Sequence, residues 1–303
     1  MKATMPLPKK IVTKIQNCKI TYTVLIAIII SLLISACAIN RSSFKDDKLI
    51  VGSTDESSIA YGVSGQGDTT LIFVHGWLCD HSFWQHQIAY FSNKYKVVWL
   101  DLAGHGGSKT NRKKFKISTF AQDVKSVFEK VDGKKVILIG HSMGGPIVIE
   151  TAKLLGENVI GIVGVDAFYT QLASVPESVK LGFLEKLKEN YPDALAQTVD
   201  SMFSENANSD LIVATYQKML SADHNMGISS LYECIKWNAH KEQIELKNFA
   251  NKLRNINGSP SGNEKVKHKS VTLIKGVGHF VNKVKPNEFN SALEMIIENF
   301  ETH

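Results

Sequence analysis

Cysteine is scarce in this chain, which has four in 303 residues. Cys18 and Cys37 lie in the N-terminal segment, so only Cys79 and Cys234 remain for the body of the protein. This scarcity excludes a small fold held together by a framework of disulfides. The two remaining thiols could pair in an oxidising compartment. They are 155 residues apart, however, and we expect two unpaired, buried thiols.

An excess of charge is also missing outside the first residues. The net charge is +6, but five lysines fall within residues 1–36, which contain no acidic residue. Setting these five aside leaves 30 basic against 29 acidic side chains. The rest of the chain is therefore nearly neutral and lacks the basic patch expected of a nucleic-acid-binding protein. It also contains no internal repeat and no long low-complexity segment.

The apolar run from Tyr22 to Ile34 is shorter than the roughly 20 residues that a spanning helix needs. It follows a lysine-bearing stretch and leads into Ile34-Ser35-Ala36-Cys37. This arrangement resembles the signal sequence and lipobox of bacterial lipoproteins, which implies a removed signal peptide over 1–36, lipidation of Cys37 and a tether over 37–48. An uncleaved membrane anchor is the alternative. Both place the body in the cell envelope, outside the cytoplasm and attached to a membrane.

Residues 49–303 alternate between strand and helix patterns. Apolar runs typical of buried strands occupy 70–74, 96–100, 136–139 and 159–165, helix patterns at 82–91, 120–131 and 147–155 separate them, and weaker strand patterns occur at 49–51, 59–63, 253–256 and 271–274. A helix beginning at Pro286 closes the chain. The alternation predicts an α/β fold with a mostly parallel, doubly wound sheet. Residues 167–226 show helical spacing and no strand, so we expect a helical insertion there.

The stretch Gly140-His141-Ser142-Met143-Gly144-Gly145 directly follows one of the buried strands and precedes a helix. Gly-x-Ser-x-Gly in this context predicts a tight turn that projects the Ser142 hydroxyl. Small residues are needed at 140 and 144, because a side chain there would collide with the neighbouring backbone. Ser142 is therefore the candidate nucleophile, at a helix N-terminus that favours negative charge.

A serine nucleophile needs a base within hydrogen-bond reach, and the base needs an orienting acid. His279 is the candidate base, because it follows a strand and is preceded by Gly276 and Gly278 in a turn at the edge of the sheet. Asp166 is the candidate acid. It ends the strand after Ser142, at the sheet edge where open α/β sheets bind ligands. A loop histidine and a helix-capping aspartate are the structural alternatives.

His75-Gly76-Trp77 ends the strand expected beside the serine strand. The backbone amides of Trp77 and Met143 could stabilise a developing oxyanion. Trp77, Met143 and Phe168 are candidates for the wall of an acyl pocket, with ordinary core packing as the alternative. His75 is a further candidate near the substrate, although we expect its imidazole to hold the loop in place.

These motifs, together with Asp101-Leu102-Ala103-Gly104-His105-Gly106 and Gly278-His279-Phe280, resemble the α/β-hydrolase superfamily over nearly all of residues 49–303. The resemblance implies the chain order nucleophile, acid, histidine, which Ser142, Asp166 and His279 satisfy, and a helical cap over the active site. Many relatives carry the acid after the penultimate strand. Here that segment has no carboxylate before Glu264, so Asp166 is the preferred acid, with Glu264 or no acid as the alternatives.

The predicted function is a serine hydrolase that cleaves carboxylic esters or related acyl substrates through an acyl-enzyme, without a metal or an organic cofactor. Amides, lactones and carbon–carbon bonds are alternative targets of the same triad. A catalytically silent ligand-binding protein on the same scaffold is the rival from another class. Epoxide hydrolysis and haloalkane dehalogenation are disfavoured, because they require aspartate at position 142. The sequence carries no indication of an oligomeric state.

Overall fold

The computed structural model describes residues 48–170, 175–262, 265 and 268–302. The predicted signal segment, the lipidation site Cys37 and nearly all of the tether lie outside these residues, as does Glu264. Within the described part, no helix combines the length and the apolar character needed to cross a membrane.

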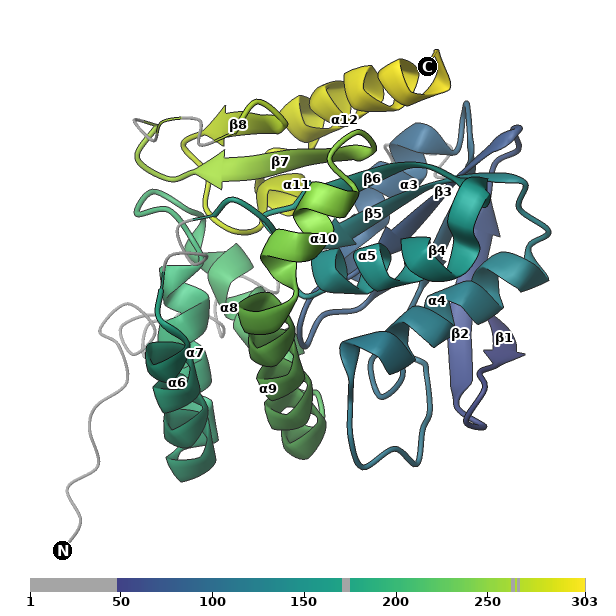
Figure 1. Ribbon diagram of the computed structural model, residues 1–303. Helices are drawn as coiled ribbons and strands as arrows, with labels where there is room; N and C mark the ends of the chain where they lie inside the picture. Colours follow the sequence, from purple (N-terminus) through teal and green to yellow (C-terminus); the bar gives the residue numbers. More distant parts are fainter. Residues whose placement is uncertain (1–47, 171–174, 263–264, 266–267, 303) are drawn as a thin grey trace, which may run out of the picture. The chain divides into compact units, whose positions relative to one another are not determined.

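A single eight-stranded sheet organises the described residues (Figure 1). Its strands are β1 (Leu49–Gly52), β2 (Ser58–Ser64), β3 (Thr69–Val74), β4 (Lys96–Leu100), β5 (Lys135–His141), β6 (Val159–Val165), β7 (Leu253–Ser259) and β8 (Val271–Lys275). They are arranged in the order β1-β2-β4-β3-β5-β6-β7-β8. β2 pairs antiparallel with both β1 and β4, and the remaining five pairings are parallel. The mostly parallel, doubly wound sheet predicted from the sequence is therefore confirmed.

Helices cover both faces of this sheet. The short 3₁₀ turn η1 (His81–Trp84), α3 (Gln85–Phe91) and α12 (Pro286–Glu301) pack on one face with the apolar side chains of one core cluster. On the other face lie α4 (Ile117–Lys130) and α5 (Gly144–Leu155), with a second cluster. All six residues of β3 are buried, because neighbouring strands flank it on both sides and helices cover it above and below. Continuous apolar runs are typical of such central strands.

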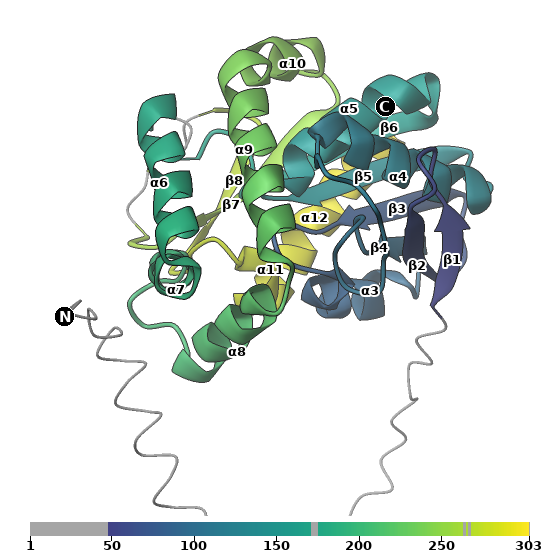
Figure 2. The same cartoon turned by 90° about the horizontal axis from the view of Figure 1, so that it is seen from below.

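A group of helices separates β6 from β7 and lies to one side of the sheet (Figure 2). It comprises α6 (Glu177–Glu189), α7 (Tyr191–Ser201), α8 (Ser209–Leu220), α9 (His224–His240) and α10 (Glu242–Asn248). The helices continue past residue 226, where we expected the insertion to end. The sequence pattern did not indicate this extension, because α9 buries a mixed set of small, polar and aromatic side chains and lacks a regular apolar stripe.

The cysteine prediction is confirmed. Cys79 and Cys234 are both free and buried. Burial raises the pKa of both thiols, that of Cys234 to about 12, so neither is a reactive thiolate near neutral pH.

Candidate active site

The predicted turn around Ser142 is present. β5 ends at His141, and α5 begins at Gly144. Ser142 has a φ of 53°, a left-handed conformation that is uncommon outside glycine. Its amide donates to the Val165 carbonyl at 2.9 Å. The glycines are required as predicted, because a Cβ at Gly140 would lie 2.3 Å from the Gly144 carbonyl oxygen.

His279 lies in the loop between β8 and the short helix α11 (Val281–Val284), which was not predicted. Its amide donates to the Met202 carbonyl at 2.7 Å, and its carbonyl accepts from Nε2 of His141 at 2.9 Å. The two imidazole rings are 4.8 Å apart. Burial lowers the pKa of His279 well below its ordinary value, which favours the neutral form that a general base needs.

Asp166 directly follows β6, in a left-handed conformation with φ 45°. Its Oδ1 accepts the Gly258 amide at 2.8 Å, whereas Oδ2 is buried without a hydrogen-bond partner. Burial raises the pKa of Asp166 well above its ordinary value, although the backbone amides of Gly258 and Val281 oppose this shift. Since Val281 is two residues from His279, the carboxyl group and the candidate base belong to the same neighbourhood.

The structure brings Ser142, Asp166 and His279 to the carboxyl ends of β5, β6 and β8. It does not join their side chains directly. Within the described residues, the Ser142 hydroxyl, the His279 ring nitrogens and Asp166 Oδ2 have no hydrogen-bond partner. Three groups with complementary chemistry thus lie at one edge of the sheet with their bonding capacity unused.

The loop after β3 approaches Ser142 closely. A Cβ at Gly76 would lie 3.1 Å from the Ser142 Cβ. Trp77 and Met143 are both buried, and neither backbone amide donates a hydrogen bond to any residue that the structure describes. Buried backbone amides are nearly always paired. Two unpaired amides, one directly after Ser142 and one in the loop that approaches it, are therefore unusual and are suited to an anionic oxygen.

His75 and Phe168 lie in the core and not on a pocket wall, which corrects the expectation that they contact substrate. Both are fully buried. Nδ1 of His75 donates to the Gly76 carbonyl at 2.8 Å, and Nε2 accepts the Leu102 amide at 3.0 Å. His75 therefore holds the loop in place, which is the role that we expected for its imidazole from the sequence. Phe168 packs against the backbone of Gly145 and Gly164.

Comparisons with known proteins agree with this geometry. A family model described as the alpha/beta hydrolase fold matches residues 69–211. Epoxide hydrolase 4 of Mus musculus is 32% identical over 90 residues, which cover 29% of this chain and 25% of that protein. 3-oxoadipate enol-lactonase 2 of Acinetobacter baylyi is 36% identical over 89 residues, which cover 29% and 33%. This chain thus spans a third or less of the length of these relatives.

Among solved structures, an esterase of Thermogutta terrifontis matches with a TM-score of 0.67 at 16% identity, covering 84% of this chain and 98% of that chain. The protein has the α/β-hydrolase fold. Within this fold, Ser142 occupies the turn between strand and helix that the sequence motif predicted.

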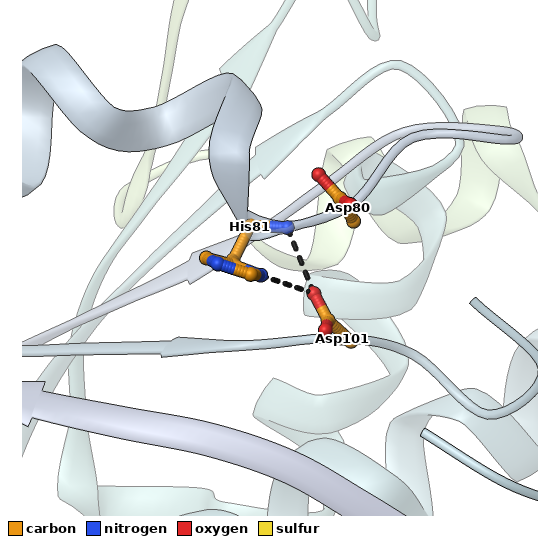
Figure 3. Close-up of side chains that lie close together, drawn as sticks. All are labelled: Asp80, His81 and Asp101. Carbon is orange, nitrogen blue, oxygen red and sulfur yellow. Dashed lines mark hydrogen bonds and ion pairs between the residues drawn. The ribbon is translucent and has the colours of Figure 1, made fainter. Parts of the chain in front are cut away.

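A charged cluster that sequence patterns did not predict lies at the carboxyl end of β4 in this α/β-hydrolase fold (Figure 3). Asp101 Oδ1 accepts from both the backbone amide of His81, at 2.9 Å, and its Nδ1, at 2.7 Å. Asp80 accepts from Ser82 and forms an ion pair with Lys218 of α8. Although the Asp80, His81 and Asp101 ligand atoms lie within 4.8 Å of one another, His81 and Lys218 already contact the two carboxylates. The cluster connects the segment after Trp77 to β4 and to the cap.

Proposed function

We propose that this protein is a serine hydrolase that cleaves carboxylic esters or related acyl compounds. The observation that carries the proposal is the left-handed Ser142 at the carboxyl edge of the sheet, flanked by the unpaired amides of Trp77 and Met143. Donors in this arrangement stabilise the oxyanion of a tetrahedral intermediate, and one such donor contributes about 10²–10³ in kcat.

In the proposed reaction, Ser142 Oγ attacks the acyl carbon while His279 accepts the hydroxyl proton. The amides of Trp77 and Met143 hold the oxyanion. His279 then returns the proton to the leaving alcohol, and water hydrolyses the acyl-enzyme by the same steps. Asp166 orients His279 and stabilises its charged form, since its free Oδ2 can accept a hydrogen bond from the imidazole.

A fluorophosphonate probe tests this proposal, because it reacts with activated serines. We expect the wild-type protein, starting at about residue 40, to be labelled and Ser142→Ala to remain unlabelled. Turnover of short p-nitrophenyl esters should be lost in the same variant. Equal labelling of both proteins would contradict the proposal. If the well-folded wild-type protein hydrolyses these esters no faster than buffer alone, a ligand-binding role would be favoured.

Cyclic esters are a second candidate substrate class, because the matched enol-lactonase is named for lactone cleavage and the same nucleophile and oxyanion donors suit a lactone. The epoxide hydrolase match does not transfer in the same way, since position 142 carries serine where that chemistry uses a carboxylate. A panel of linear esters, lactones and amides would separate these substrate classes.

We further propose that the protein is a lipoprotein anchored through Cys37 in the cell envelope. The support is the sequence pattern of residues 1–37, with its lysines, short apolar run and Cys-containing motif. Cys37→Ser should abolish the increase in mass that lipidation produces and should release the protein from the membrane fraction. A wild-type protein of unaltered mass in the soluble fraction would contradict the anchor.

A further inference from the structure

The side chain of Trp77 connects the candidate oxyanion loop to the cap. Its indole Nε1 donates to the Gly227 carbonyl at 2.7 Å, across 150 residues of sequence. Gly227 belongs to the first turns of α9, and Ser230 Oγ donates to the same carbonyl at 3.1 Å. The residue whose backbone amide is the proposed oxyanion donor is therefore held from above by a cap helix.

The contact is close because position 227 has no side chain. A Cβ there would lie 2.6 Å from the Tyr191 hydroxyl and 2.8 Å from Cδ2 of Leu78. Leu78 adopts a left-handed conformation with φ 57°. Helix α9 thus rests directly on the segment that follows Trp77, and a larger residue at 227 would press against the Leu78 side chain.

Other bonds fix the Trp77 peptide while leaving its N–H available. The Trp77 carbonyl accepts from the Cys79 thiol at 3.3 Å, and the Cys79 amide donates to the Gly76 carbonyl at 3.2 Å. The Trp77 amide itself has no partner among the described residues. Carbonyl and indole are held, and the free N–H lies in the loop that passes Ser142.

A second indole bond holds the other end of the same helix. Nε1 of Trp237 donates to Oε1 of Glu150 at 2.7 Å, and Lys241 contacts the same oxygen at 3.2 Å. Glu150 is on α5, whose N-terminus carries the other candidate donor, Met143. Helix α9 therefore binds both elements that supply the proposed oxyanion donors, and its first turns hold the side chain of one donor residue, Trp77, directly.

We propose that α9 positions the oxyanion donor of Trp77 through the bond between the Trp77 indole and the Gly227 carbonyl. The Trp77 side chain and Gly227 are positioning groups, distinct from the Trp77 amide that would contact substrate. This inference rests on the proposed hydrolase function. It implies that the cap influences the rate of the chemical step as well as the choice of substrate, since a displacement of about 1 Å can cost about 10² in rate.

Trp77→Phe tests the inference, because it removes the indole N–H and keeps an aromatic ring. We expect kcat for p-nitrophenyl acetate, normalised to serines titrated by the fluorophosphonate, to fall about 10- to 100-fold, with KM changed less than about threefold. The sulfur of a thionoester accepts hydrogen bonds poorly. The rate ratio of p-nitrophenyl acetate to its thiono analogue should therefore also fall, by about tenfold, because a displaced donor no longer favours oxygen.

Trp237→Phe is the matched control, since it removes the same kind of bond from the far end of α9. It should lower the unfolding temperature, leave kcat within about twofold and leave the rate ratio unchanged. If Trp77→Phe does not fold, Gly227→Ala takes its place. The added methyl would lie 2.8 Å from Cδ2 of Leu78 and so press on the segment that follows Trp77, and the same fall in the ratio is expected.

An unchanged ratio in the folded Trp77 or Gly227 variant, or an equal fall in Trp237→Phe, would overturn the positioning role and leave the hydrolase function intact. A wild-type protein that turns over neither ester would refute the proposed function, and the positioning role with it.

Discussion

Asp166→Asn is expected to lower the hydrolytic activity strongly without destabilising the fold. The substitution removes the charge of the candidate acid and keeps its shape. The amide oxygen can still accept the Gly258 N–H, which Oδ1 now accepts at 2.8 Å. The new NH₂ group replaces Oδ2, which is buried without a partner. The variant should therefore fold as the wild type does.

The expected loss of activity follows from the charge that develops on His279. In the proposed reaction His279 becomes a cation when it takes the Ser142 proton, and the Asp166 carboxylate would supply the counter-charge. Asparagine cannot supply it. The loss of an orienting acid lowers kcat by about 10⁴ in a serine triad, which corresponds to about 5 kcal/mol of activation free energy. We expect a loss of this order.

The stability of the same variant should change in the opposite direction. Burial raises the pKa of Asp166 in the folded state above its unfolded value. Between those two values the folded state binds more protons than the unfolded state, so the stability of the wild type falls as pH rises through this interval. The variant does not titrate there. Its advantage in unfolding temperature should be larger at pH 8 than at pH 4.

Two measurements check this reasoning. Hydrolysis of p-nitrophenyl acetate gives kcat, and circular dichroism melting at pH 4 and pH 8 gives the unfolding temperatures. Glu264→Gln is the control and should leave kcat within about threefold. An Asp166→Asn enzyme that retains more than a tenth of the wild-type kcat would refute the assignment, as would a Glu264→Gln enzyme that loses turnover.

Three further outcomes are expected. Ser142→Gly should abolish ester hydrolysis and raise the free energy of unfolding in urea by about 1 kcal/mol, because φ 53° strains a non-glycine residue; a lower stability would argue against strain. Since burial lowers the pKa of His279 well below 6.5, the acidic limb of kcat/KM against pH should have its midpoint below 6.5, and a midpoint above 7 would contradict this. Arg112→Met should cost about 3–5 kcal/mol in urea unfolding, because it deprives the buried Asp123 carboxylate of its partner; a loss under about 1 kcal/mol would show that the pair contributes little.

Local patterns predicted most of the sheet. The apolar runs at β3, β4, β5 and β6 identify central strands, because such strands must be apolar on both faces. The Ser142 turn follows from its local motif: a Cβ at Gly140 would collide with Gly144, only four residues away, although Gly144 itself must be small because it packs on the distant Val74 carbonyl. Features set by neighbours in sequence were therefore accessible without a structure.

Features that depend on contacts between residues far apart in sequence could not be predicted without a structure. The bond from Trp77 to Gly227 joins residues 150 positions apart, and neither residue has a local pattern that indicates it. The boundary of the cap was misplaced because α9 buries residues such as Ser230 and Cys234, which carry a weak apolar signal. His75 can be fully buried because its Nε2 accepts a hydrogen bond from the Leu102 amide. This contact is visible only in the folded sheet.

The chain enters the described domain near the carboxyl ends of the strands and leaves it near their amino ends. Lys48, directly before β1, lies 4.0 Å from Asp101 at the carboxyl ends of the strands. Glu301, at the end of α12, accepts a hydrogen bond from Thr69, the first residue of β3. A fusion partner or solid support joined ahead of β1 would therefore approach the edge that carries Ser142. One joined after α12 would leave that edge open, so coupling through the C-terminus is the better choice for an immobilised catalyst.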